Sequence, residues 1–262
     1  LVLANVFAGG EQEGSTGQRA PYTIEVGGST SVTPLMEMFA QEYQRLNPHI
    51  RVNINGTGSG DGIQNAGTLY QIGMSSRELT PAEQGRGLVV ETVAIDGIAV
   101  IVNNNNPVSN LTVDQIRDIY TGAITDWSQV SGGTKSGRIA VISREAGSGT
   151  RGAFEEIVGF QGRLLAGANE STSTGAIIAG IAQNPDAIGY ISLGSVSNAV
   201  KALSVNDIAP TSANVTRGAY RVARPFIILT GRNIHPESKA FADWMLSSAG
   251  QAVVRRSWIP VR

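Results

Sequence analysis

The run TVAIDGIAVIVN at residues 92–103 is long, apolar and rich in β-branched residues, and it decides how the rest of the chain is arranged. A second extended run, AYRVARPFIILTG, occupies residues 219–231. If each run crosses between two domains, residues 21–98 plus 222–262 form one lobe (lobe I) and residues 99–221 form the other (lobe II). The two crossing strands would then form a hinge, with a ligand cleft between the lobes. A single large sheet is the competing arrangement.

Outside these runs, strand-like and helix-like segments alternate, which is typical of an α/β protein. YTIEVGGSTS (22–31) predicts a strand and a turn before a helix, and RIAVISREAGSGTRGAF (138–154) repeats this order. Residues 112–115 predict a capping box at the start of another helix. ESKAFADWMLSSAGQAVVRRS (237–257) predicts one helix near the C-terminus.

The composition excludes several classes of protein. The 262 residues include 20 Lys and Arg against 21 Asp and Glu, so the chain has no basic field suited to nucleic acid. It has no cysteine, which excludes disulfides and thiolate metal sites and argues against a lipid-anchored N-terminus. No run approaches the ~20 apolar residues that a membrane span needs.

Residues 1–20 are expected to be the remnant of a secretory signal followed by a linker. The apolar start ends in Val6-Phe7-Ala8, in the pattern of a cleavage site, although the charged beginning of a signal is missing. Residues 9–20 are rich in Gly, Gln and Ser, which suits a linker. A short apolar strand or a disordered tag is the alternative. A signal would predict export to the periplasm or another extracytoplasmic compartment.

Four turns rich in Ser, Thr and Gly come directly before predicted helices. A helix N-terminus offers unpaired N–H groups and partial positive charge, so it attracts anions, and hydroxyls add further donors. Ser and Thr are also ordinary helix caps, so one such turn says little. Turns that follow strands of an open α/β sheet can converge on one crevice, which favours a shared anion site. The turns occupy residues 28–31, 56–60, 147–150 and 171–174.

Arg144 lies just before the third turn and strengthens the anion interpretation. Its guanidinium keeps its charge at physiological pH and donates paired hydrogen bonds to an oxyanion. A structural ion pair, for example with Glu145, is the alternative role. Arg77 and Arg151 fit solvated surface charges as well as they fit ligand contacts.

Catalytic interpretations have less support. The chain contains neither a G-x-x-x-x-G-K-[ST] P-loop nor a G-x-S-x-G nucleophile elbow. The two histidines, His49 and His235, sit beside prolines in predicted loops, and a serine nucleophile such as Ser148 would need one of them as its base. Hydroxyls, amides and arginine bind an oxyanion well and transform it poorly. No metal site or cofactor is expected.

The ordered series of motifs resembles the periplasmic phosphate-binding proteins of phosphate ABC transporters. The resemblance covers almost the whole chain from Tyr22. It implies a two-lobed, non-enzymatic receptor, expected to be monomeric, that holds inorganic phosphate between its lobes and delivers it to a membrane permease. The motifs are GGSTSVTPLMEMFAQEY (27–43), NGTGSGDGI (55–63), IGMSSREL (72–79), DQIRDIYTGAITDW (114–127), SREAGSGTR (143–151), AIGYISL (187–193), RPFIILTG (224–231) and FADWMLSSAGQAVV (241–254).

Carried over motif by motif, the resemblance implies phosphate ligands from both predicted lobes. Some members of the family have an aspartate where this chain has Ser76, and that carboxylate accepts the proton of hydrogen phosphate and helps to exclude sulfate. Ser76 can accept or donate, so the acceptor is open here: Asp61 or Glu145 would serve, and each also fits a surface role. The implied ligands are Ser29, Thr30, Ser31, Ser59, Ser76, Arg144, Ser148, Gly149 and Thr150.

Three other functions stay open on the sequence. The same fold would serve a receptor for sulfate, molybdate or a phosphate ester, and the missing aspartate keeps this alternative open. A phosphoryl-transfer or hydrolytic enzyme would use Ser148 or Ser59, with help that the sequence does not reveal. A surface adhesion or signalling protein would use phosphate only to rigidify its fold.

Overall fold

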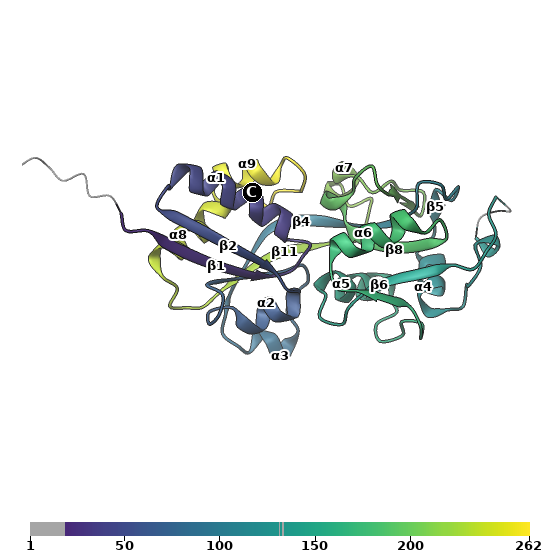
Figure 1. The fold of residues 1–262 in the computed structure, drawn as a ribbon, viewed down its shortest axis with the longest axis horizontal. Coiled ribbons are helices and arrows are strands. Elements are labelled where there is room, and N and C mark those ends of the chain that lie inside the picture. Colours follow the sequence, from purple (N-terminus) through teal and green to yellow (C-terminus); the bar gives the residue numbers. More distant parts are fainter. Residues whose placement is uncertain (1–18, 131, 133) are drawn as a thin grey trace, which may run out of the picture.

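The chain folds into two lobes of helices packed on strands, joined at the centre by β4 (Val89–Val102) and β11 (Ala223–Thr230) (Figure 1). The computed structural model describes residues 19–130, 132 and 134–262. The arrangement confirms the predicted two-lobed α/β fold. The segment expected to be a signal remnant and linker, apart from its last two residues, lies outside the described residues.

Lobe I is a sheet with helices on both faces. Besides β4 and β11, its elements are β1 (Tyr22–Gly28), α1 (Thr33–Leu46), β2 (Ile50–Gly56), α2 (Ser59–Asn65), β3 (Ile72–Ser75), α3 (Pro81–Gln84), α8 (Pro236–Leu246) and α9 (Ser248–Val254). The strand order is β2-β1-β3-β11-β4, with β1 parallel to both its neighbours and β11 antiparallel to both of its own. Helices α1, α8 and α9 cover one face through a core that contains Phe39, Phe241 and Trp258 (Figure 1). On the other face, Ile63 of α2 shares a smaller core with Leu229.

Lobe II repeats this architecture around the far half of β4. Its elements are β5 (Asn110–Leu111), α4 (Val113–Thr121), η1 (Trp127–Gln129), β6 (Ala140–Arg144), α5 (Gly149–Val158), β7 (Asn169–Ser171), α6 (Thr174–Gln183), β8 (Ala187–Ser192), η2 (Leu193–Ser195), β9 (Lys201–Ala202), β10 (Ser204–Val205) and α7 (Ser212–Thr216). The main sheet has the order β4-β8-β6-β7. Helices α4 and α5 contribute to a core with the buried Trp127, Phe154 and Tyr190, and α6 packs through Ile177 and Ile181 on a second core.

Strand β4 belongs to both lobes. Its residues 89–92 and 94–97 pair with β11, and its residues 98–102 pair with β8. In the second half, Ile98, Val100 and Val102 contribute to one core while Ala99 and Ile101 contribute to the other, because successive side chains of a strand point to opposite faces. The strands therefore follow one continuous order, and the two sheets share β4.

The chain returns from lobe II to lobe I just before β11. The Ile98 N–H donates to the Val222 carbonyl at 2.7 Å, and the Tyr220 hydroxyl donates to the Ile98 carbonyl at 2.8 Å. The separate cores on either side of this point support the division into 21–98 plus 222–262 and 99–221. At the level of single residues that division stays a prediction.

A buried ion pair joins the two hinge strands. Nη2 of Arg224 on β11 lies 3.2 Å from Oδ2 of Asp96 on β4, and Oδ1 of Asp96 accepts from the Ser192 hydroxyl of lobe II at 2.9 Å. Burial raises the pKa of the Asp96 carboxyl to about 6, and the neighbouring Arg224 opposes that rise. The pair therefore ties both crossing strands to the end of β8 in lobe II.

Two local predictions have opposite outcomes. The capping box at the start of α4 is confirmed, since the Thr112 hydroxyl accepts from the Gln115 N–H and the Gln115 side chain accepts from the Thr112 N–H. The prediction of a single C-terminal helix is wrong, because Ser247 adopts an extended conformation and caps a separate helix, α9, by accepting from the Gly250 N–H at 3.3 Å.

Within the described part of the chain, the helices all lack the combined length and apolar character that a bilayer span requires.

Candidate ligand site between the lobes

The first hydroxyl turn follows β1 at the edge of lobe I that faces lobe II. Gly28 has a φ of 133°, and a Cβ there would lie 2.3 Å from the Met74 carbonyl oxygen, so only glycine allows this close approach to β3. The next residue, Ser29, donates its N–H to the same carbonyl at 3.0 Å. The chain then places Thr30 and Ser31 ahead of α1, with Ser31 fully buried.

Ser59 and Ser76 come from separate segments and meet beneath this turn. Ser59 begins α2 and Ser76 follows β3, and both are completely buried. The Ser76 N–H donates to the Ser59 hydroxyl at 3.1 Å, and the Ser29 hydroxyl donates to the Ser76 hydroxyl at 2.9 Å. Lobe I therefore presents a connected cluster of hydroxyls.

Lobe II supplies the facing wall from the end of β6 and the start of α5. Arg144 is the last residue of β6, and Ser148 is the N-cap of α5, where its hydroxyl accepts from the Arg151 N–H at 3.3 Å. Gly149 and Thr150 are the first two residues of the ten-residue α5 and are buried. Their N–H groups belong to the helix terminus, where donors have no partner within the helix.

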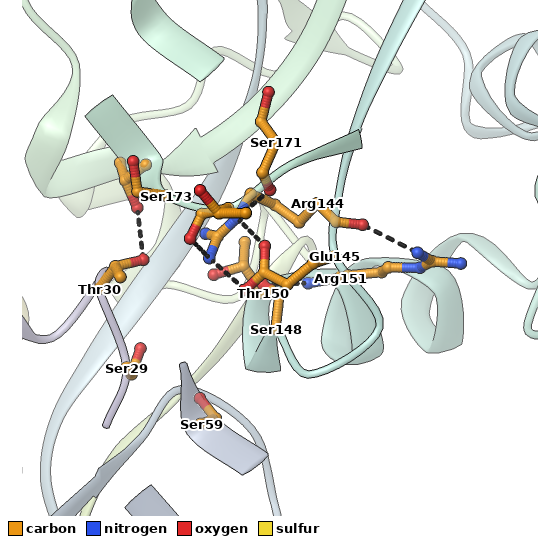
Figure 2. Close-up of polar contacts among 12 residues, drawn as sticks. Ser29, Thr30, Ser59, Arg144, Glu145, Ser148, Thr150, Arg151, Ser171 and Ser173 are labelled. Atoms are coloured by element: carbon orange, nitrogen blue, oxygen red, sulfur yellow. Dashed lines mark hydrogen bonds and ion pairs between the residues drawn. The ribbon is translucent and has the colours of Figure 1, made fainter. Parts of the chain in front are cut away.

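The two walls touch each other directly (Figure 2). The Ser31 and Thr150 hydroxyls are 2.8 Å apart, and the Gly60 N–H of lobe I donates to the Gly147 carbonyl of lobe II at 3.0 Å. In Figure 2, Ser29, Thr30 and Ser59 approach from the lobe I side and Arg144, Ser148 and Thr150 from the lobe II side. The structure thus brings all nine residues implied by the resemblance to one place between the lobes.

Arg144 is held rigidly and keeps one nitrogen without a protein partner. Its Nε and Nη2 atoms each lie 2.9 Å from a carboxylate oxygen of Glu145, and Nε also donates to the Ser171 carbonyl at 3.2 Å. No hydrogen bond joins its Nη1 to a described residue, although the side chain is only 3% exposed. The ion pair with Glu145 and the ligand role are therefore compatible, because they use different edges of the guanidinium.

The backbone of Arg144 is fixed by Tyr190 of β8. The Tyr190 hydroxyl accepts from the Arg144 N–H at 3.2 Å and lies 2.8 Å from the Ser143 hydroxyl. Burial raises the pKa of Tyr190 to about 12, so its hydroxyl stays neutral at physiological pH.

The other two arginines considered from the sequence are engaged in ion pairs. Arg77 binds Glu83 at 2.7 Å, and its hydrogen bonds hold the pKa of the Glu83 carboxyl down at about 2. Arg151 binds Glu155 at 2.7 Å and also donates to the Arg144 carbonyl. Both arginines are therefore engaged by protein groups.

Neither histidine lies at the hydroxyl cluster. His49 is 3.4 Å from Glu237, and the ring of His235 stacks on Tyr22 with centroids 4.1 Å apart. These contacts involve β1 and α8, so neither imidazole has a described contact with Ser148. The described residues also include no group of three or more His, Asp or Glu side chains that could hold a metal ion.

The fourth turn, 171–174, contributes more than sequence reasoning assigned to it. The buried Thr174 at the start of α6 places its hydroxyl 3.2 Å from the Ser31 hydroxyl and 3.4 Å from the Thr30 hydroxyl. The carbonyls of Ser171 and Thr172 accept from the Arg144 side chain. The turn was visible in the sequence as a helix cap, but its cross-lobe partners lie more than a hundred residues away.

Replacing Thr174 by valine is expected to weaken ligand binding by about threefold to tenfold. The change keeps the shape of the side chain and removes a hydroxyl that bridges the lobes, a loss of about 0.5–1.5 kcal/mol. Thr172→Val is the matched control, because Thr172 lies in the same turn with an exposed side chain. Calorimetric titration of both variants with inorganic phosphate measures the loss. Equal phosphate affinities of Thr174→Val and Thr172→Val would contradict a bridging role for Thr174.

Known proteins with this fold identify the family. Residues 12–249 match the family model described as a PBP superfamily domain. A Clostridium perfringens protein, described as a phosphate ABC transporter substrate-binding protein with bound phosphate, is 42% identical with a TM-score of 0.89, over 92% of this chain and 100% of that one. An ABC-type phosphate transport receptor from Vibrio cholerae is 35% identical with a TM-score of 0.74, over 91% and 100% of the two chains.

A sequence relative agrees with the structural ones. The phosphate-binding protein PstS of Borreliella burgdorferi is 29% identical over 246 residues, which cover 88% of this chain and 87% of the relative. These matches extend across both lobes and the strands that join them. The chain belongs to the PBP superfamily and, within it, to the substrate-binding proteins of phosphate ABC transporters.

Proposed function

We propose that the protein binds inorganic phosphate between its lobes and delivers it to the membrane permease of a phosphate ABC transporter. The observation that carries the proposal is the meeting of hydroxyls and the α5 terminus around the free edge of the buried Arg144. The relatives named for phosphate binding or transport support the choice of anion. The proposed ligand residues are Ser29, Thr30, Ser31, Ser59, Ser76, Arg144, Ser148, Gly149 and Thr150.

The chemistry of these groups suits a phosphate dianion. Hydrogen bonds to an ionised acceptor are about twice as strong as neutral ones, so a dry site with many donors and one guanidinium can replace the anion's hydration shell. The N–H groups at the start of α5 add the partial positive charge of a helix terminus. Glu145 neutralises part of the charge of Arg144, so the dipoles of hydroxyls and amides carry much of the binding.

We also infer that the protein acts outside the cytoplasm as a monomeric receptor and catalyses no reaction. A permease partner and an extracytoplasmic location follow from the transport role of the family. The hydroxyl of Ser148 caps α5 and has no described contact with either histidine, which supports a binding role over a nucleophilic one.

Calorimetric titration with inorganic phosphate tests the proposal. We expect saturable binding of one phosphate per chain, and a smaller radius of gyration in solution scattering when phosphate closes the lobes. Absence of binding at millimolar phosphate would remove the proposed function. Turnover of a phosphate ester that disappears in Ser148→Ala would instead favour an enzyme.

A further inference from the structure

A second buried arginine lies in the hinge, apart from the nine proposed ligand residues. Arg224 of β11 is 4% exposed, and its Nη2 lies 3.2 Å from Oδ2 of Asp96 on β4. Its Nε and Nη1 atoms are buried and have no hydrogen-bond partner among the described residues. Burying a charge is costly unless the charge is paired and fully hydrogen-bonded, so the guanidinium of Arg224 is compensated only in part.

The carboxylate of Asp96 is shared among several donors. Its Oδ2 accepts from Arg224, while its Oδ1 accepts from the Ser192 hydroxyl at 2.9 Å and from the Gly194 N–H at 3.4 Å. By contrast, the arginine of the ligand site binds both oxygens of Glu145 at 2.9 Å with two of its nitrogens. The Asp96–Arg224 pair is therefore the looser of the two ion pairs, and Arg224 keeps more of its positive field.

One face of β8 connects this pair to the ligand site. Ser192, which binds Asp96, and Tyr190 are two residues apart on β8, so their side chains point to the same face. The Tyr190 hydroxyl accepts from the Arg144 N–H at 3.2 Å. Burial lowers the pKa of Arg224, Asp96 opposes this change, and the positive charge of Arg144 adds to it. The two guanidiniums therefore act on each other through the protein interior.

An anion between the lobes changes the balance of these charges. Charges in the protein interior interact more strongly than they do in water, because the effective dielectric constant is lower. A dianion bound at Arg144 is therefore attracted by Arg224 and repelled by Asp96 without touching either side chain. Arg224 belongs to lobe I and Arg144 to lobe II, so the anion attracts a guanidinium of each lobe and favours their closure.

We propose that Arg224 supplies a second positive charge to the phosphate site from the hinge, and that Asp96 limits this contribution. The inference rests on the proposed function. Both residues act through their electric field and make no contact with the anion. The net charge of the hinge then adjusts the affinity for phosphate, while the hydroxyls, the α5 terminus and Arg144 determine the shape of the site.

Two substitutions with opposite expected effects test this. Asp96→Asn keeps the shape of the side chain and an oxygen for the Ser192 hydroxyl but removes the negative charge, so phosphate should bind about threefold to tenfold more tightly. Arg224→Met removes the positive charge and should weaken phosphate binding by at least about tenfold. Arg224→Lys keeps the charge on a side chain of different shape, and it should bind phosphate more tightly than Arg224→Met does.

Asp207→Asn and Arg221→Met are the matched controls, because each removes the same charge from an exposed position. Both controls should bind phosphate as the unchanged protein does. Calorimetric titration with inorganic phosphate at mildly alkaline pH, where the Asp96 carboxyl is ionised, measures each affinity. The melting temperature of each variant shows that it is folded.

The sign of the change in Asp96→Asn decides the inference. A purely structural ion pair would weaken phosphate binding when either partner is replaced, so an affinity of Asp96→Asn equal to or below that of the unchanged protein would overturn the inference and leave phosphate binding intact. Equal affinities of Arg224→Met and Arg224→Lys would also overturn it, because shape and not charge would then be responsible. A lack of phosphate binding by the unchanged protein would remove the proposed function itself, and the inference with it.

Discussion

Replacing Arg144 by methionine is expected to weaken phosphate binding by roughly 30-fold to several thousand-fold. Removing one partner of a buried, hydrogen-bonded charge interaction costs about 2–5 kcal/mol, which corresponds to that range of affinity. The Arg144 side chain is 3% exposed, and Nη1 is the nitrogen of its guanidinium without a hydrogen bond to a described residue. Methionine has a similar length but no donor, and it leaves the Glu145 carboxylate without its counter-charge. Calorimetric titration with phosphate measures the loss.

Two further variants show whether charge or geometry is responsible. Arg144→Lys keeps the positive charge but loses the planar fork that binds Glu145 and the ligand on different edges, so an intermediate affinity is expected. Arg217→Met removes a charge from an exposed position of lobe II and should leave the affinity unchanged. An affinity of Arg144→Met within threefold of the unchanged protein would show that Arg144 has only a structural role.

The two-lobed architecture was predictable because one strand carries an unusual pattern. Residues 98–102 are apolar at every position, as expected for a strand buried on both faces. In amphipathic helices and half-buried strands, apolar and polar residues instead alternate with a regular period. The extended run at residues 92–103 is also longer than a strand within one lobe has to be. The hydroxyl turns were also predictable, since strand–turn–helix units place such turns at the same edge of a sheet.

Side-chain contacts between the lobes could not be predicted from the sequence. The role of Thr174 depends on hydroxyls of Ser31 and Thr30, which belong to the other lobe. The sequence raised an ion pair and a ligand contact as alternatives for Arg144, and only the orientation of its guanidinium shows that both fit. Ser247 fits the interior of a helical pattern equally well, and tertiary packing decides that it ends α8 and caps α9.

Replacing Gly149 by alanine is expected to prevent the lobes from meeting as they do here, and to weaken phosphate binding by about 5-fold to 150-fold. A Cβ on Gly149 would lie 2.2 Å from the Ser59 hydroxyl oxygen and 2.8 Å from the Ser76 hydroxyl oxygen. Both serines are fully buried, so neither can move aside freely. Overpacking of this kind costs about 1–3 kcal/mol, and here it falls on the contact between the lobes.

Gly147→Ala provides a control within the same turn, because a Cβ at that position would meet nothing within 4 Å. Both variants add one methyl group near the start of α5, so a difference in phosphate affinity isolates the contact with lobe I. Each lobe keeps its own core, and the Gly149→Ala protein should therefore melt cooperatively while its radius of gyration in saturating phosphate stays larger than that of the control. Equal affinity and equal compaction of the two variants would mean that phosphate is held without this contact, and the site would then have to be assigned mainly to lobe II.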